Sequence, residues 1–400
     1  MPDTTLPSGL QASPIRAGIE QLADSPIVEV FRAGFRLPGL IPMWAGEPDV
    51  PTPDFICEAA AAALREGRTF YSDNRGTPAL LAALAAYHKR LWGVEIPTSR
   101  LALTLSGMNA VMQVAQATCT VGDNAVCITP SWPNIMRAIQ INGATVREVP
   151  MTAGESGWQL DLEAVFAACD SRTRLIYVAS PGNPTGWMIS RPEAEALLDF
   201  CRQRGIALLS DEVYHRIVYD APVAFSFLEI ARPDDPLFVC HSFSKSWAMT
   251  GWRLGWMVYP EGCTSAFEKL IQFNTSGGVE FLQAGCIAAL EQGEDFVRGF
   301  VARCRLGREV VSERLAAMPR VRHIPASGAF YAMFAVEGVT DTLQFCLRAV
   351  QEARIGMAAG ISFGAGAAHT VRLCHAKSPE LLHEAMDRLD RFTAGYRENR

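Results

Sequence analysis

Short apolar runs, rich in β-branched and aromatic residues, alternate with segments of helical periodicity over the first two thirds of this chain. The runs are LALTL (101–105), AVCIT (125–129), RLIYVA (174–179), IALLS (206–210), LFVCH (237–241) and LGWMVY (254–259). Continuous apolar runs of this length are typical of strands buried on both faces, and intervening helices connect such strands in parallel. The pattern therefore predicts an α/β fold, with a mostly parallel sheet covered by helices on both faces.

The pattern changes after Gly262. Long helical segments at about 263–273, 279–292 and 295–317 lead into short strands near 329–334 and 371–375, and a final helix starts at Pro379. A chain of 400 residues is long enough for two domains. We expect a large domain at 51–262, extending into the helices of 263–295, and a smaller α+β domain at 296–400. Residues 1–50, rich in proline and glycine, are predicted to form an arm that packs with the smaller domain.

The distribution of charge and the cysteine content argue against nucleic acid, membrane and metal as partners of this chain. The 42 acidic and 36 basic residues are spread along the chain without a basic stripe, so no nucleic-acid partner is expected. The N-terminal residues do not resemble a signal peptide, and no run approaches the length of a membrane span, so we expect a soluble, cytoplasmic protein without membrane contact. The 11 cysteines have no CxxC spacing and mostly lie in apolar runs, which indicates buried thiols and no metal site.

Several polar residues directly follow the predicted strands. Ser106 and Gly107 follow the first strand, and the others are Trp132, Asn183, Asp211, Ser242 and Lys245. In open parallel sheets, ligands bind beyond the carboxyl ends of the strands. We therefore expect these residues to converge on one cleft.

Three of these residues suit a ligand that is an aromatic aldehyde. The amine of Lys245 can form an imine with an aldehyde, and burial or a cationic neighbour would make it a better nucleophile. Trp132 offers a face on which an aromatic ring can stack. Asp211 can keep a ring nitrogen protonated, so that electrons released at a substrate carbon flow into the ring.

A second group suits a phosphate on the same ligand. Arg253 and the hydroxyl of Ser242 can form charge-assisted hydrogen bonds. The backbone N–H groups of Gly107 and Met108 stand where a helix is predicted to start, and a helix N-terminus favours an anion. The chemistry indicated is that of a phosphorylated aromatic aldehyde.

Six motifs, four of which contain residues named above, occur in a characteristic order along nearly the whole chain. They are GEPDVPTP (46–53), TPSWPN (129–134), SPGNPTG (180–186), SDEVY (210–214), SFSKSWAMTGWRLGW (242–256) and SGAFY (327–331). Together they resemble the motifs of the class I/II pyridoxal-phosphate-dependent aminotransferases, the aspartate aminotransferase-like enzymes of fold type I. The resemblance implies pyridoxal 5′-phosphate as cofactor, transfer of an amino group between an L-amino acid and a 2-oxo acid, and a homodimer with its active sites at the interface.

The resemblance also implies a role for each matching residue. Lys245 forms the internal aldimine and moves the proton at the substrate α-carbon, Asp211 pairs with the pyridine nitrogen, and Tyr214 and Asn183 bond the phenolic oxygen. The remaining cofactor contacts are Trp132 on the ring and Ser106, Gly107, Met108, Ser242 and Arg253 on the phosphate, with Tyr71 supplied by the neighbouring subunit. The substrate α-carboxylate is implied to bind Arg372, with Asn183 and Gly46 nearby.

Three functions share this scaffold, and the fold alone does not separate them. The first is an aminotransferase. The second is another pyridoxal-phosphate enzyme, such as a β-lyase or a decarboxylase, which would retain the same residues. The third is a non-catalytic regulator that binds the cofactor. It ranks lowest because no DNA-binding module or basic patch precedes the motifs.

The sequence departs from the aspartate-specific relatives where they bind the distal carboxylate. Met108 stands in place of a lysine, and Gln272 falls near the position of an arginine. Arg75 is either a replacement cation from across the interface or an exposed loop arginine. We expect neutral donors with apolar or aromatic side chains to compete well with aspartate. His215 and His241, close to the motifs, are interpreted as structural histidines with satisfied hydrogen bonds.

Overall fold

The computed structural model describes residues 13–398, and its centre is a sheet of seven strands. Their order is β2 (Leu101–Thr104), β10 (Gly255–Val258), β9 (Leu237–Ser242), β8 (Ala207–Asp211), β7 (Thr173–Ala179), β3 (Asn124–Thr129) and β4 (Thr145–Pro150). β10 runs antiparallel to both of its neighbours, and the other neighbouring pairs are parallel. The predicted α/β fold with a mostly parallel sheet is confirmed.

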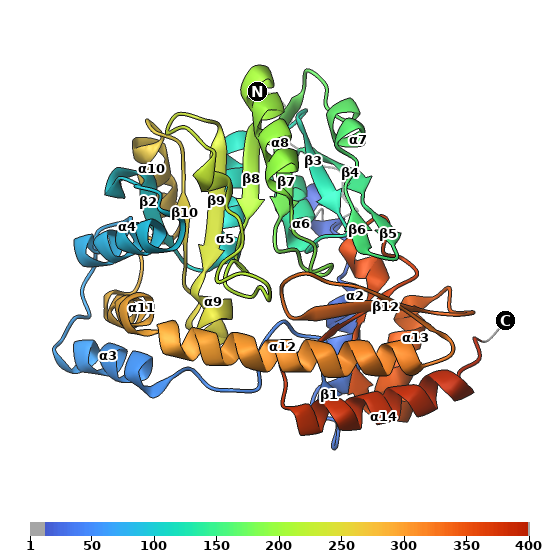
Figure 1. Ribbon diagram of the computed structural model, residues 1–400. Helices are drawn as coiled ribbons and strands as arrows, with labels where there is room; N and C mark the ends of the chain where they lie inside the picture. The colour runs from blue at the N-terminus through green and yellow to red at the C-terminus, as the bar shows by residue number, and fades with distance from the viewer. Residues whose placement is uncertain (1–12, 399–400) are drawn as a thin grey trace, which may run out of the picture.

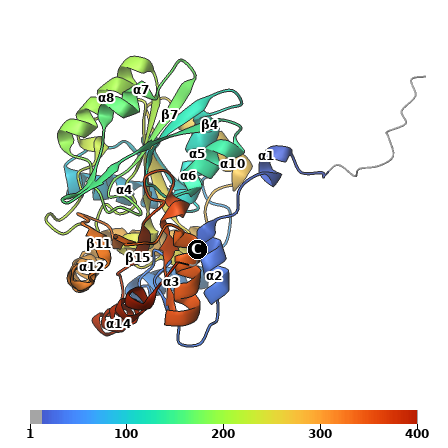
Figure 2. The ribbon, with the colours of Figure 1, turned by 90° about the vertical axis from the view of Figure 1, so that its right-hand side faces the viewer.

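Helices cover both faces of this sheet, as Figure 2 shows. One face carries α4 (Pro78–Trp92), α7 (Leu162–Ala167) and α8 (Arg191–Arg204), and the other carries α5 (Gly107–Thr118), α6 (Asn134–Ile141) and α10 (Thr264–Asn274). Alternate residues of each strand enter the two apolar layers: Ile176 and Val178 pack on the first face, and Leu175 and Tyr177 on the second. α3 (Asp54–Arg65) and α11 (Glu280–Gln292) pack against each other beside α4.

The helix boundaries follow local signals in the sequence. The Thr77 hydroxyl accepts a hydrogen bond from the N–H of Leu80 at 3.3 Å, and Asp161 caps α7 in the same way. Gly93 ends α4 in the left-handed conformation, with φ of 70°. α3 begins at Asp54, and Pro53 takes the capping position.

A second sheet of four antiparallel strands lies beside the first. Its order is β11 (Val321–Ile324), β12 (Tyr331–Val336), β15 (Val371–Cys374) and β14 (Ala358–Ala359), and α13 (Thr342–Arg348) and α14 (Pro379–Gly395) pack with it. The long helix α12 (Glu294–Ala317) runs below the seven-stranded sheet in Figure 1 and packs against β11 and β12 of the smaller sheet. The sheet and these helices surround an apolar core of their own, as the expected smaller domain requires.

The N-terminal segment joins this second core. α2 (Pro26–Gly34) contributes Val30, and β1 (Ile41–Pro42) pairs in parallel with β13 (Ile355–Gly356). Residues 1–12 of the expected arm lie outside the described residues. The boundaries at 50, 262 and 296 stay predictions.

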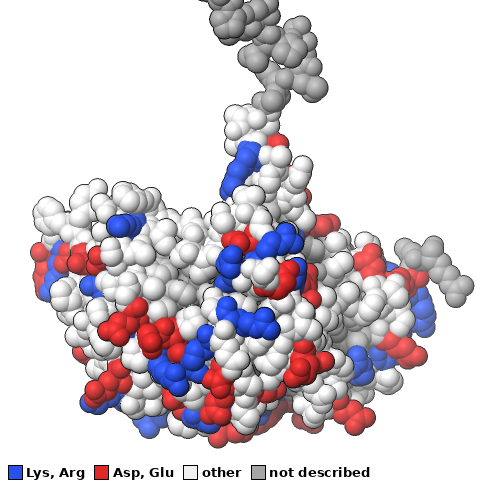
Figure 3. Space-filling model, turned by 90° about the horizontal axis from the view of Figure 1, so that it is seen from above, with Lys and Arg blue, Asp and Glu red and all other residues white. Residues whose placement is uncertain are grey.

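The remaining short elements are α1 (Ala17–Glu20), α9 (Phe243–Ser246) and the hairpin of β5 (Thr152–Gly154) with β6 (Gly157–Gln159). On the face shown in Figure 3, acidic and basic side chains are interspersed. Within residues 13–398, no helix combines the length and the apolar character that a membrane crossing requires.

Candidate active site

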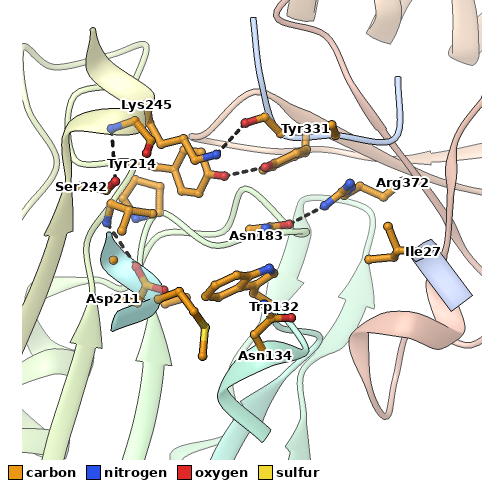
Figure 4. A pocket seen from close by; sticks show the side chains of 18 of the residues that line it. Ile27, Trp132, Asn134, Asn183, Asp211, Tyr214, Ser242, Lys245, Tyr331 and Arg372 are labelled. Carbon is orange, nitrogen blue, oxygen red and sulfur yellow. Dashed lines mark hydrogen bonds between the residues drawn. The ribbon is translucent and has the colours of Figure 1, made fainter. Parts of the chain in front are cut away.

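A pocket of about 400 Å³ opens at the carboxyl ends of the parallel strands, where the two sheets meet. Eleven of the thirteen sequence-predicted site residues line it: Gly46, Gly107, Met108, Trp132, Asn183, Asp211, Tyr214, Ser242, Lys245, Arg253 and Arg372. Ser106 and Tyr71 do not. The predicted convergence of the residues that follow the strands is therefore present, and Figure 4 shows most of them in place.

Lys245 projects from α9, the short helix that follows β9. The Ser242 hydroxyl accepts a hydrogen bond from the N–H of Ser244 at 3.1 Å and so fixes the start of that helix. The Lys245 amine donates to the carbonyl of Gly46 at 2.6 Å. Burial lowers the pKa of Lys245 to about 8, and the positive charge of Arg372 acts in the same direction. Part of the amine population is therefore neutral and nucleophilic near neutral pH.

Gly46 must be a glycine for this arrangement. A Cβ atom at this position would lie 1.8 Å from the hydroxyl of Tyr331. The hydroxyls of Tyr331 and Tyr214 are hydrogen-bonded to each other, and a side chain at Gly46 would displace that pair. Burial raises the pKa of Tyr214 well above its usual value, so its hydroxyl stays protonated and can donate.

Asp211 ends β8 and is only 5% exposed. One carboxylate oxygen accepts from the N–H of Val213 at 3.3 Å, and the other accepts from the hydroxyl of Tyr177 at 2.9 Å. Burial raises the pKa of Asp211, and the bond from Tyr177 opposes that effect. A protonated ring nitrogen in the pocket would supply the positive partner that a buried carboxylate requires.

The phosphate-binding candidates gather at the start of α5. Ser106 adopts a φ of 101°, and its hydroxyl accepts from the N–H of Asn109 at 3.2 Å, so it caps the helix rather than lining the pocket. The next residue, Gly107, lies against the neighbouring strand so closely that a Cβ on Gly255 would be 2.8 Å from its nitrogen. Arg253 lines the same end of the pocket and donates to the carbonyl of Thr250 at 2.8 Å.

Arg372 faces this group from β15 of the second sheet. Its guanidinium donates to Oδ1 of Asn183 at 2.9 Å and to the carbonyl of Trp44. The rings of Tyr331 and Phe363 lie 4.5 and 4.8 Å from its central carbon. Its buried Nε has no hydrogen-bond partner among the described residues, so a donor is available for an anion in the pocket.

Ten lining residues were not among the sequence predictions for the site: Ile27, Trp44, Ala45, Asn134, Tyr177, Ala179, Pro181, Val213, Ser244 and Tyr331. Tyr331 ends the SGAFY motif and Asn134 ends TPSWPN, so their positions within these motifs could have identified both as site residues. Ile27 and Trp44 precede the first motif, and nothing in their local sequence indicates a site.

The two histidines next to the motifs lie behind the pocket rather than in it. Nδ1 of both His215 and His241 donates to the carbonyl of Glu212, at 3.0 and 3.3 Å. Nε2 of His215 accepts from the hydroxyl of Tyr87 at 2.8 Å, so His215 is satisfied as expected. The interpretation of His241 as fully satisfied is wrong, because its buried Nε2 has no partner among the described residues.

Tyr71 and Arg75 precede α4, away from the pocket. The Tyr71 side chain is 93% exposed. The Arg75 side chain is only 16% exposed, so the interpretation as an exposed loop arginine is wrong. Its guanidinium pairs with Glu268 at 2.8 Å and donates to the carbonyl oxygens of Thr98 and Leu101.

Comparison with known proteins agrees with this fold. The family model "Aminotransferase class I and II" matches residues 38–389, and the chain belongs to that family. It is 32% identical over 359 residues to a probable aspartate/prephenate aminotransferase of Aquifex aeolicus, covering 86% of this chain and 89% of the relative. It is 30% identical over 380 residues to aromatic-amino-acid aminotransferase 2 of Thermococcus litoralis, covering 93% and 96%.

Solved structures show the same likeness. The aspartate aminotransferase of Thermotoga maritima superposes with a TM-score of 0.89 at 29% identity, over 95% of this chain and all of that one. The chain is accordingly an aminotransferase, an enzyme that moves an amino group between amino acids and 2-oxo acids. The printed names of the relatives differ in their substrates, so the family alone leaves the donor open.

Proposed function

We propose that this aminotransferase works with pyridoxal 5′-phosphate held by Lys245 and Asp211, and that it prefers amino donors with uncharged side chains. One observation carries the cofactor assignment: a half-buried amine and a buried carboxylate, Lys245 and Asp211, line one pocket together with a helix N-terminus and an arginine. This donor set fits the aldehyde, the ring nitrogen and the phosphate of that cofactor.

The cofactor, when bound, supplies an electron sink for the bond that breaks at the substrate α-carbon. The residues of this chain supply the rest. Arg372 orients the substrate by binding the substrate α-carboxylate with its planar guanidinium. The hydrogen bond to Asn183 holds that guanidinium in place. The Lys245 amine takes and returns the proton at the α-carbon, and its lowered pKa suits a base that acts near neutral pH.

The other contacts position the ring. The Tyr214 hydroxyl and the Asn183 amide would donate to its phenolic oxygen, and Trp132 would stack on its face. The N–H groups of Gly107 and Met108, with Ser242 and Arg253, would hold the phosphate. The same residues would serve a β-lyase or a decarboxylase. Transamination is favoured because the family and the printed names of the relatives are those of aminotransferases.

The preference for donors with uncharged side chains is supported by the roles of the cationic residues in the pocket, because each of them is already engaged. Among the described residues the lining holds three: Lys245, Arg253 and Arg372. Each already has a role in the proposal, which leaves none for a distal carboxylate. Met108 stands in the lining where aspartate-specific relatives carry a lysine. A carboxylate buried without a partner would cost several kcal/mol.

Arg75 is a poor replacement for the missing cation. Its guanidinium is bound to Glu268 and to two backbone carbonyl oxygens of its own chain. Reaching a neighbouring active site would require it to leave all three. Ile27 instead lines the pocket near Arg372, where the substrate side chain would extend, and Asn134 lines it next to Trp132 (Figure 4).

We further propose a homodimer in which Tyr71 reaches the phosphate site of the other subunit. The support is a surface of exposed apolar residues. Phe70 is 81% and Tyr71 93% exposed, and both line a surface hollow with Val279 and Phe281. Exposed patches of this kind mark protein–protein contacts.

The cofactor assignment can be tested with two lysine variants. The purified holoenzyme should show visible absorbance from the lysine-bound cofactor, and Lys245→Ala should lose it. Lys377→Ala is the matched control, because Lys377 is a buried lysine that donates to the adjacent carbonyl, that of Glu47, at 3.2 Å. It should keep the absorbance. Near-native transamination by Lys245→Ala would disprove the assignment.

The reaction type has its own test. Adding an amino donor without an acceptor should convert the cofactor to its amine form and release the 2-oxo acid, with no ammonia. Release of ammonia or of carbon dioxide in proportion to turnover would identify a lyase or a decarboxylase instead.

A further inference from the structure

Tyr177 reaches Asp211 from the neighbouring strand. In the register of β7 with β8, Ala179 lies opposite Asp211, and Tyr177 lies opposite Leu209. Tyr177 is thus two residues deeper in the sheet, on the same face as Ala179, at a distance of about 6.6 Å along the strand. A tyrosine side chain spans that offset, and its hydroxyl meets the Asp211 carboxylate at 2.9 Å. Ala179, directly opposite, has no polar atom with which to bond the carboxylate.

The direction of this hydrogen bond is fixed. Tyr177 is fully buried, and burial raises its pKa well above the ordinary value, so the phenol stays neutral and donates. A donor to a carboxylate stabilises the charged form. Burial raises the pKa of Asp211, whereas the Tyr177 bond lowers it. The hydroxyl therefore favours the charged form of the carboxylate and opposes the effect of its burial.

Two other titratable groups face Asp211. Cys240 lies opposite it on β9, and burial raises the pKa of that thiol well above its usual value, so it is neutral. The Lys245 ammonium attracts the carboxylate from the pocket. When Lys245 is bound to the cofactor, its amine is no longer a free ammonium and its attraction for Asp211 changes. The hydrogen bond from the Tyr177 phenol to Asp211 remains. Tyr177 is not one of the residues that the motifs identify.

We infer that Tyr177 is a positioning residue that keeps Asp211 ionised and thereby keeps the proton on the ring nitrogen of the cofactor. The inference rests on the proposed function. Without the hydroxyl, the carboxylate would bind a proton more tightly, and the proton shared between ring nitrogen and carboxylate would move toward Asp211. The ring would then carry less positive charge and withdraw fewer electrons from the α-carbon.

A decrease in the positive charge of the ring should shift the pH titration of the visible absorbance in a defined direction. A less positive ring repels less strongly the proton held at the Lys245 nitrogen. The pH at which the visible absorbance titrates should therefore rise. Besides Asp211, the charged and titratable groups near that nitrogen are Arg372, Arg253, Glu47, Cys374 and Tyr214, and a substitution at Tyr177 leaves these five unchanged.

Tyr177→Phe is the direct test. The variant should keep its visible absorbance, and the titration midpoint should rise by about one pH unit. The rate constant for α-proton loss in single turnover should fall about tenfold to a hundredfold, since a hydrogen bond to a charged group is lost. Substrate affinity should change less than about twofold, because Arg372 is untouched.

Tyr259→Phe is the matched control. Tyr259 is buried in the same apolar layer as Tyr177, and its hydroxyl bonds to the carbonyl of Leu101 at 3.4 Å rather than to Asp211. This variant should titrate and react like the wild type. An unchanged midpoint and rate in Tyr177→Phe, with the absorbance intact, would overturn the inference. Absence of the absorbance in the wild type would overturn the proposed function instead.

A second substitution keeps the test decisive if Tyr177→Phe does not fold. 3-Fluorotyrosine placed at position 177 alone keeps the ring and the hydroxyl, and its more acidic phenol donates more strongly. The titration midpoint should then fall below the wild-type value. A midpoint equal to or above the wild-type value would contradict the role assigned to Tyr177.

Discussion

The guanidinium of Arg372 and the amide oxygen of Asn183 meet at 2.9 Å, although the two residues come from different sheets. Arg372 lies on β15 of the smaller sheet, and Asn183 lies in the loop after β7 of the larger one. The bond fixes the plane of the guanidinium toward the pocket. Any change in the relative placement of the two sheets must therefore move the proposed carboxylate-binding group.

Arg372→Lys should raise KM for both the amino acid and the 2-oxo acid. A lysine keeps the charge but loses the planar fork, and the loss of one or two charged hydrogen bonds corresponds to a factor on the order of a hundred. The α-carboxylate is bound alike before and during the reaction, so kcat should change far less. Arg320→Lys, which removes a guanidinium bonded to the carbonyl oxygens of Thr393 and Tyr396, is a control far from the pocket. Steady-state kinetics with unchanged KM in Arg372→Lys would contradict the assignment.

Met108→Lys should shift donor preference toward aspartate. The substitution adds a cation to a pocket lining that, within residues 13–398, holds only Lys245, Arg253 and Arg372 as cations. The ratio of kcat/KM for aspartate to that for phenylalanine should rise roughly tenfold or more, equivalent to about 1.4 kcal/mol. A donor panel with 2-oxoglutarate as acceptor measures this ratio. A wild-type enzyme that already prefers aspartate strongly would refute the proposed preference.

Stability should fall as pH drops below about 6.5, because buried histidines stay neutral in the folded protein. Burial lowers the pKa of His88 and of His375 to about 3, and it also lowers the pKa values of His215 and His241. Below pH 6.5 the unfolded chain takes up protons that the folded chain does not. Each such histidine then costs about 1.4 kcal/mol at pH 5.5. Glu212, whose pKa burial raises to about 7, acts in the opposite sense and offsets about one histidine.

Urea denaturation between pH 5.5 and 7.5 measures this dependence. His88→Gln keeps an acceptor for the indole N–H of Trp256 but cannot titrate, so its slope should be reduced by about one proton. His383→Gln, at an exposed position, should leave the slope unchanged. A free energy of unfolding that stays constant from pH 7.5 to 5.5 would show that these imidazoles titrate in the folded state.

Subunit complementation tests the proposed dimer. Tyr71→Ala and Lys245→Ala proteins, each impaired alone, should regain activity when mixed under conditions that exchange subunits. A mixed dimer would have one site with both residues intact and one site with neither. The expected recovery is up to about a quarter of wild-type activity per total subunit, since half of the dimers are mixed and each has one working site. With exchange confirmed, no recovery would place Tyr71 in the site of its own subunit.

The sequence could predict much of the site because parallel strands end at one edge of a sheet. Asp211 ends β8 and Lys245 follows the neighbouring strand β9, and their convergence needs only the strand order. Tyr177 could not be found in this way, since its reach to Asp211 depends on the register of β7 with β8. Ile27 and Trp44 could not be predicted from the sequence either, because their place in the pocket depends on how the N-terminal segment packs on the second core.

The pairing of β1 with β13 bears on how the protein is synthesised. The N–H of Met43 donates to the carbonyl of Gly356, and the N–H of Cys374 donates to the carbonyl of Met43, both at 2.8 Å. Met43 leaves the ribosome long before either partner exists. The strands of the large sheet, which end at Val258, are all available much earlier. We expect nascent chains stalled before Ile355 to contain a protease-resistant large sheet and an N-terminal segment that is still cleaved.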